Sequence, residues 1–250
     1  MKPIFESAKQ LESELISIRR TLHQYPEIGS ILPRTQSFVF GKLEEYGYCP
    51  QKLCESAVTA TISGKQPGKT ILLRADMDAL PIQEAAPVSF ASENGSMHAC
   101  GHDMHTAMLL GAAKLLKQYQ QDLVGTVKLV FQPDEEGFTG AKAMLKAGVL
   151  ENPHVDTGIA FHVVSGIPSG TVMCGSGTCM AGCTLFQIHI KGTGCHGAMP
   201  ETGVDPSILR PMFICLFRKS LQEKSHPPSQ PHLPLAGFLP AKLQISSLKR

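Results

Sequence analysis

Three short apolar runs, each followed by side chains that can bind a metal or move a proton, constrain the fold of this chain most strongly. The runs span residues 70–76, 125–131 and 157–162. Helix-like segments at about 103–119 and 140–147 lie between them. Strands that alternate with helices in this way predict an α/β fold with a central, mostly parallel sheet flanked by helices. Functional sites in such folds lie beyond the carboxyl ends of the strands.

The segments that precede these runs extend the same pattern. Residues 4–23 and 34–47 have apolar residues at helical spacing, and residues 57–63 alternate as a strand does. Residues 65–68 have turn chemistry, so we expect the buried strand to begin at 70. Residues 84–97 show no periodicity and are predicted to form a loop.

The composition changes after Gly175, which places a domain boundary near residue 180. Residues 184–191 alternate as in a sheet with one solvated face, and residues 204–222 can form a helix. From residue 225 onward proline is frequent and acidic residues are few, which is typical of a disordered tail.

The segment 97–116 contains the densest group of candidate metal ligands, ahead of an apolar helical stretch. Within eight positions stand His98, Cys100, His102 and His105. Gly101 lets an extended loop point Cys100 and His102 at one metal or at two neighbouring ones. From these residues alone, a buried thiol beside a surface histidine is an equal alternative. We assign His98 and His105 to helix packing or to orienting the ligands.

Carboxylates and a further histidine follow the later strands. Glu135 and Glu136 come after the strand at 125–131. Adjacent carboxylates commonly mark a solvated turn, but at a buried strand end one can bind a metal while the other takes a proton from an activated water. His162 ends the next strand, and its position makes it a third candidate ligand, although a lone histidine is more often a packing residue.

Three other residues have predicted supporting roles. Asp76 and Asp78 can orient ligand histidines through the second ring nitrogen, or they can cap the turn before Pro81. His196 stands in a Gly-rich loop at 192–200, where it can polarise a substrate or belong to a surface turn. The loop lacks the Lys-Ser or Lys-Thr of a phosphate-binding loop.

The overall composition excludes several classes of protein. A net charge of +2 does not indicate a surface that binds nucleic acid. No apolar stretch is long enough for a membrane span. The first twenty residues lack the apolar core of a signal peptide, so we expect a cytoplasmic protein. A chain of this size needs no disulfides, and we expect its eight cysteines to be free thiols.

Four motifs in order resemble the M20 metallopeptidase family, in particular the amidohydrolases that hydrolyse N-acyl amino acids. They are residues 73–81 (LRADMDALP), 97–105 (MHACGHDMH), 131–137 (FQPDEEG) and 194–200 (GCHGAMP). The resemblance covers about residues 10–208. It departs locally at Cys195, where the family more often has glycine.

The resemblance implies two divalent metal ions, manganese or zinc, with nickel or cobalt as alternatives. The matching metal ligands are Cys100, His102, Glu136 and His162. Glu135 matches the general base, and His196 matches a histidine that polarises the scissile carbonyl. The implied substrate is a small N-acyl amino acid.

The resemblance also implies a domain organisation. Residues 1–180 match the N-terminal part of the catalytic domain, and residues 181–209 match the start of a smaller α+β lid domain through which relatives form homodimers. Residues 210–250 are expected to be a divergent tail, disordered or frameshifted. One further ligand histidine of the family is not recognisable in this chain. We therefore keep two alternatives to an active deacylase: an inactive, truncated remnant, and a dipeptidase.

Overall fold

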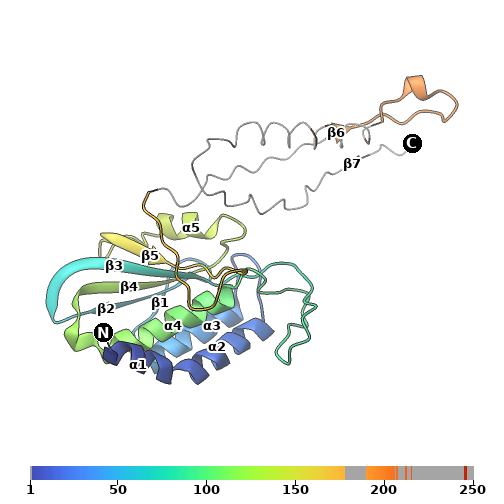
Figure 1. Ribbon diagram of the computed structural model, residues 1–250. Helices are drawn as coiled ribbons and strands as arrows, with labels where there is room; N and C mark the ends of the chain where they lie inside the picture. Colours follow the sequence, from blue (N-terminus) through green and yellow to red (C-terminus); the bar gives the residue numbers. More distant parts are fainter. Residues whose placement is uncertain are drawn as a thin grey trace. The chain divides into compact units, whose positions relative to one another are not determined.

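The computed structural model describes residues 2–177, 190–205, 207, 212, 215, 245 and 246. The chain divides into two compact units, Met1–Thr171 and Val172–Arg250 (Figure 1). In the second unit, β6 (Ile190–Lys191) pairs in parallel with β7 (Ile245–Ser246), and a 3₁₀ helix spans Pro200–Thr202. Most of the predicted strand at 184–191 and of the predicted helix at 204–222 lies outside the described residues. The proposed lid and tail stay predictions.

A five-stranded sheet forms the centre of the first unit, in the order β1-β2-β4-β3-β5. The strands are β1 (Gln51–Lys52), β2 (Val58–Ser63), β3 (Gln66–Asp76), β4 (Val124–Gln132) and β5 (Thr157–Ala160). Strand β3 runs parallel to both β4 and β5, whereas β2 is antiparallel to β1 and β4. The sheet is therefore mixed, with the parallel half where the sequence predicted it, and the α/β expectation is confirmed.

Helices cover both faces of this sheet (Figure 1). They are α1 (Lys2–Gln10), α2 (Glu12–Gln24), α3 (Pro33–Glu45), α4 (His102–Gln118) and α5 (Gly140–Lys146), with a 3₁₀ turn at Gln120–Asp122. The alternation of strand side chains assigns the faces. Leu129 and Phe131 of β4 pack into the large core with α2, α3 and α4, whereas Val130 packs with Met144 of α5. Within the described residues, no helix is long and apolar enough to cross a membrane.

The structure corrects two predicted boundaries. The first predicted helix is divided into α1 and α2 at Leu11. The Leu11 amide donates to the Ala8 carbonyl three residues back, which replaces the regular i to i−4 hydrogen bond of an α-helix at this point. The predicted turn at 65–68 belongs mostly to β3, which begins at Gln66. A register shift between Gln66 and Thr70 accommodates the proline and glycine in that stretch, since bulges tolerate both residues.

Two local environments also differ from expectation. The helix predicted from about residue 103 begins at His102, so Asp103 lies inside α4, and Gly101 precedes the helix in the left-handed conformation. The predicted buried strand at 157–162 is shorter, and all four residues of β5 are exposed. Strand β5 is an edge strand that pairs only with β3 in the described part of the chain.

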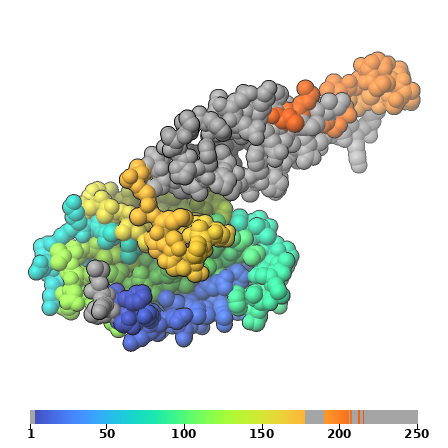
Figure 2. Space-filling model, viewed as in Figure 1, coloured from blue at the N-terminus to red at the C-terminus, as the bar shows by residue number. Residues whose placement is uncertain are grey.

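A buried ionic cluster ties the loop at 84–97 to α2 and α4, and Figure 2 shows this loop beside the N-terminal segment. The His23 ring nitrogens lie 2.8 Å from Asp103 Oδ2 and 2.9 Å from Glu84 Oε1. Arg19 Nε donates to the same Asp103 oxygen at 2.7 Å. The Ser92 amide donates to the second Glu84 oxygen at 2.6 Å. A ring with a carboxylate at each nitrogen fits the protonated form of His23.

We expect His23→Gln to lower the free energy of unfolding by about 1.5–3 kcal/mol at pH 6, the range for hydrogen bonds between charged groups. The Asp103 hydrogen bond raises the pKa of His23, burial opposes this rise, and Glu84 adds to it. A raised folded-state pKa gives stability that is complete below about pH 6.5 and is lost as the pH rises through the folded-state value. Urea unfolding at pH 6, 7.5 and 9 measures this loss.

The matched control is His154→Gln, because His154 is an exposed histidine whose side chain is 76% accessible. The fall in stability from pH 6 to pH 9 should be smaller in His23→Gln than in the wild type and unchanged in the control. Equal pH slopes in all three proteins would show that His23 does not contribute through its charge.

Candidate metal centre

The predicted ligands converge where β3, β4 and β5 end and α4 begins. Three sets of side chains bring one potential ligand atom from each member within 4.8 Å of the others. The sets are Cys100 with His102 and His162, Asp76 with His102 and His105, and His102 with Glu135 and Glu136. His102 belongs to all three sets and is the geometric centre of the cluster.

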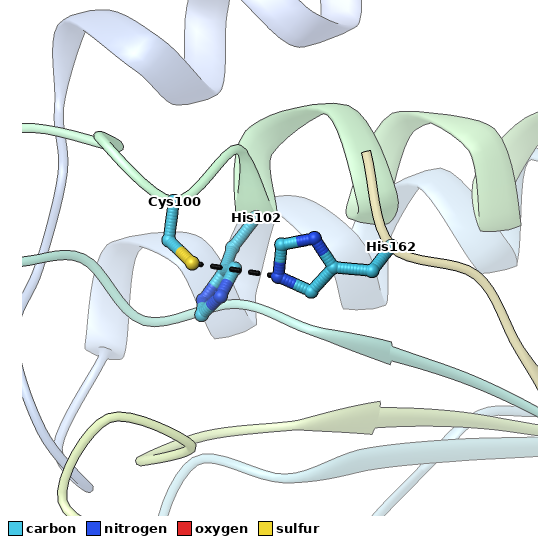
Figure 3. Close-up of side chains that lie close together, drawn as sticks. All are labelled: Cys100, His102 and His162. Atoms are coloured by element: carbon cyan, nitrogen blue, oxygen red, sulfur yellow. Dashed lines mark hydrogen bonds between the residues drawn. The ribbon is translucent and has the colours of Figure 1, made fainter. Parts of the chain in front are cut away.

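Cys100 and His162 face each other beside His102 (Figure 3). Their Sγ and Nε2 atoms are 3.4 Å apart. The Nδ1 atom of His162 lies 2.7 Å from the Val163 carbonyl oxygen. A carbonyl only accepts, so Nδ1 carries the proton and Nε2 keeps a lone pair directed toward the thiol. Thiolate and imidazole together are a donor pair that suits zinc.

His102 is fully buried, and its two nitrogens have different surroundings. Nδ1 donates to the backbone oxygen of Asp78 at 2.8 Å, so Nε2 is the nitrogen that remains for another partner. Nε2 lies 3.7 Å from Asp76 Oδ2 and 3.9 Å from Glu136 Oε1. These three atoms are buried, and none makes a hydrogen bond within the described residues, although Asp76 Oδ2 also lies 2.8 Å from Arg74 Nη1 in an ion pair. Because buried polar atoms are rarely left unpaired, their convergence fits a bound cation.

His105 and His98, which we did not assign as metal ligands, have different environments. Both nitrogens of His105 are used: Nδ1 donates to Asp76 Oδ1 at 2.6 Å, and Nε2 accepts from the Val163 amide at 2.9 Å. This arrangement agrees with an orienting role for His105. His98 is buried but belongs to none of the three sets. Burial lowers the pKa of His98 to about 4, so its ring is neutral at pH 7.

Asp76 and Asp78 act differently from the simple expectation that each carboxylate orients a ligand histidine. Asp76 orients His105, which we did not assign as a ligand, and its second oxygen faces His102 Nε2. Asp76 is therefore itself a candidate ligand, which sequence reasoning missed. Asp78 holds His102 through its main-chain oxygen. Its carboxylate instead accepts the amides of Glu135 and Glu136, at 3.0 Å each.

The electrostatics of the cluster favour a cation. Burial lowers the pKa of His102, but Asp78, Cys100 and Asp76 raise it, and the balance lies at about 11. Burial raises the pKa of Asp76, while His105, His102 and Arg74 bring it down to about 2. Without a metal ion the His102 ring is therefore protonated at neutral pH, and a bound cation would take the place of the proton on Nε2 among the same negative groups.

Glu135 has the properties of a proton carrier. Burial raises its pKa, and the neighbouring carboxylates of Glu136 and Asp76 raise it further. A carboxylate whose pKa is shifted toward neutrality accepts and releases protons more readily at pH 7. Its backbone amide is fixed by Asp78, so the side chain starts from a defined position.

Gly101 permits the close approach of the loop before α4 to the segment after β5. Its φ of +85° lies in the left-handed region, and a Cβ at this position would clash with the side chain of Val163. The sequence prediction that Gly101 allows the bend between Cys100 and His102 fits this geometry.

His196 belongs to the second unit, and its role stays a prediction. Its side chain is exposed, and Nδ1 accepts a hydrogen bond from the Ala198 amide at 3.2 Å. The six cysteines that the described residues include are free thiols, in agreement with the prediction.

The fold and the converging donors define an α/β protein with a candidate centre for two metal ions at the carboxyl edge of the parallel strands. The sequence profile of peptidase family M20/M25/M40 matches residues 72–242. The chain belongs to this family.

Curated relatives and a solved structure agree with this membership. The chain is 42% identical over 220 residues to an N-acetyl-L-cysteine deacetylase of Bacillus subtilis, covering 87% of this chain and 52% of the relative. It is 42% identical over 199 residues to an N-acyl-L-amino acid amidohydrolase of Geobacillus stearothermophilus, covering 78% and 53%. It thus spans about half the length of the curated relatives it matches.

The solved structure is that of the YXEP protein of Bacillus subtilis, described as a dinuclear metal-binding peptidase of the M20 family. It aligns with a TM-score of 0.61 at 41% identity and covers 64% of this chain and 45% of that one.

Proposed function

We propose that the protein is a metal-dependent amidohydrolase that deacylates N-acyl amino acids. The observation that carries the proposal is the convergence next to Glu135 of buried atoms of Asp76, His102 and Glu136 that make no hydrogen bond within the described residues. The names of the curated relatives support the substrate class. Cys100, His102, Glu136 and His162 would hold two divalent ions, manganese or zinc, and Asp76 is a further candidate ligand.

In the proposed reaction, water adds to the amide carbonyl carbon and the carbon–nitrogen bond breaks. When bound, the metal ions supply Lewis-acid polarisation and lower the pKa of a coordinated water to about 7. Glu135 takes a proton from the attacking water and delivers it to the leaving amine nitrogen. Asp78 keeps Glu135 and Glu136 in place through their amides, and Asp76 with His105 keeps the His102 side of the cluster ordered. We assign polarisation of the substrate carbonyl to His196, on the resemblance of its loop.

A second candidate is a protein that binds metal but does not turn substrate over. This candidate needs only the side chains that converge around His102, which the described residues supply. The substrate class is also open to one alternative, because dipeptides contain the same amide bond.

Metal content and turnover measured on the same preparation distinguish these functions. We expect two divalent ions per chain after loading with manganese or zinc, together with release of the acyl group from N-acetyl amino acids or hippurate. Bound metal without turnover of any of these substrates, or of dipeptides, would identify the non-catalytic protein. Faster turnover of dipeptides than of N-acyl amino acids would assign the peptidase activity instead.

A further inference from the structure

A cavity of about 400 Å³ lies on the α5 side of the sheet. Its walls come from β1, β2, β4 and the turn at 147–153, and none of the candidate metal ligands lines it. Its size falls within the range of small-molecule sites. Among its lining residues are Cys49, Thr59, Thr61 and Lys128.

Lys128 is the unusual member of this lining. It stands in the middle of β4 and is 5% exposed. Its ammonium group donates to the Glu151 carbonyl oxygen at 2.6 Å, and it forms no ion pair within the described residues. Lysine is almost never this buried unless it is paired with an opposite charge. Burial accordingly lowers the pKa of Lys128.

The acidic residue nearest in sequence to this contact does not neutralise the lysine. Glu151 offers Lys128 its backbone oxygen, while its own carboxylate is 63% exposed and lies 3.5 Å from His154 Nδ1. The Glu151 charge opposes the drop in the Lys128 pKa without forming a contact. Two of the three ammonium protons therefore have no acceptor in the described part of the chain.

The hydroxyl groups beside Lys128 are also available to a ligand. Thr61 stands directly opposite Lys128 in the antiparallel β2–β4 pair, and Thr59 stands opposite Val130. Directly opposed residues project from the same face of a sheet. Both threonines line the cavity, and neither hydroxyl takes part in a hydrogen bond within the described residues.

We propose that this cavity binds a small anion whose carboxylate or phosphate group pairs with Lys128 and accepts hydrogen bonds from Thr59 and Thr61. The anion supplies the negative charge that the buried ammonium lacks. This site is separate from the metal centre, and it does not depend on the proposed amidohydrolase activity.

The exposed thiol of Cys49 is a built-in reporter, because it lines the same cavity. The experiment measures the alkylation rate of Cys49 in the full chain by peptide mass spectrometry, with iodoacetamide as the reagent. Sodium acetate and inorganic phosphate are the two probes, each titrated against chloride at constant ionic strength. The exposed Cys174 is the internal control. We expect either or both anions to slow the reaction of Cys49 and leave that of Cys174 unchanged.

Variants test whether the protection of Cys49 from alkylation depends on Lys128. Lys128→Met should raise the apparent dissociation constant roughly 30-fold or more, since truncating a buried charge partner costs at least about 2 kcal/mol. Lys142→Met, which removes an exposed lysine of α5, should have no effect. Thr61→Val leaves the Lys128 contact with Glu151 intact and should weaken binding about threefold. Thr61→Val therefore still tests the proposed site if Lys128→Met does not fold.

The outcomes separate the ligand classes and the two sites. Protection by phosphate alone, or by acetate alone, assigns the anion class. Protection that persists in His102→Gln shows that the anion does not act through the metal centre. Absence of protection by both anions in the wild type would overturn the proposal, as would equal protection in a folded Lys128→Met variant.

Discussion

We expect Glu135→Gln to abolish detectable turnover of an N-acetyl amino acid and to leave the metal content of the protein unchanged. The amide side chain of glutamine has nearly the same size but cannot accept a proton, so the substitution removes the general base alone. Loss of a positioned general base lowers the rate by about 10²- to 10⁴-fold. Burial and the neighbouring carboxylates raise the pKa of Glu135, which supports its assignment as the proton carrier.

The measurement compares kcat on an N-acetyl amino acid with metal content and far-ultraviolet circular dichroism for the same samples. Glu44→Gln is the matched control, because Glu44 is an exposed glutamate on α3. Turnover within a few-fold of the wild type in Glu135→Gln would assign the base to another group. Loss of metal together with turnover would show that Glu135 is a ligand instead.

The α/β class and most elements could be predicted because hydrophobic periodicity is a local property of the chain. The strand ends at Asp76 and Gln132, and the helix that begins near His102, follow from apolar residues at periods of two and of about four. The parallel pairing then brings the ends of β3 and β4 together. This geometry explains why residues from separate motifs could be grouped into one site before their positions were known.

The unpredicted features depend on tertiary contacts. Asp78 accepts the hydrogen bond of His102 Nδ1 through its main-chain oxygen, because its carboxylate already accepts the Glu135 amide. This choice depends on the position of the Glu135–Glu136 turn, which the spacing of residues does not encode. The burial of Asp103 depends on its hydrogen bonds with Arg19 and His23, which lie 84 and 80 residues earlier in the chain. Similarly, the exposure of β5 depends on its position at the edge of the sheet, whereas its apolar composition is equally compatible with a central strand.

The same distinction limits what could be said of the ligands. A sequence pattern identifies residues able to bind metal, and it cannot show which of their atoms are already engaged. His105 is as good a donor as His102 by type, but both of its nitrogens are used, whereas Nε2 of His102 is unpaired. Asp76 shows the converse, because one oxygen accepts from His105, whereas the other makes no hydrogen bond and lies between Arg74 Nη1 and His102 Nε2. The hydrogen bonds that each side chain already makes therefore distinguish the candidate ligands from the supporting residues.

His102→Gln is expected to abolish tight metal binding. His102 belongs to every candidate ligand set, and its Nε2 is the atom on which Asp76 and Glu136 converge. Substitutions of groups that merely orient ligands weaken metal binding about 10- to 100-fold, so removal of a central ligand should weaken it by more than about 100-fold. Inductively coupled plasma mass spectrometry after dialysis against a competing chelator measures the loss.

His154→Gln removes an exposed histidine and should retain the full metal content. Circular dichroism must show that His102→Gln is folded, because the loss of a fully buried side chain also lowers stability. Full metal occupancy at unchanged affinity in a folded His102→Gln variant would refute the central position of this histidine.

A companion substitution, Asp76→Asn, tests the ligand that the sequence did not predict. Asparagine keeps a carbonyl acceptor for His105 Nδ1 and removes the negative charge that faces His102 Nε2 and Arg74 Nη1. If Asp76 is a ligand, the metal affinity of Asp76→Asn falls by as much as that of His102→Gln. If Asp76 only orients His105, the loss stays within the 10- to 100-fold range of supporting residues, at about one to three kcal/mol.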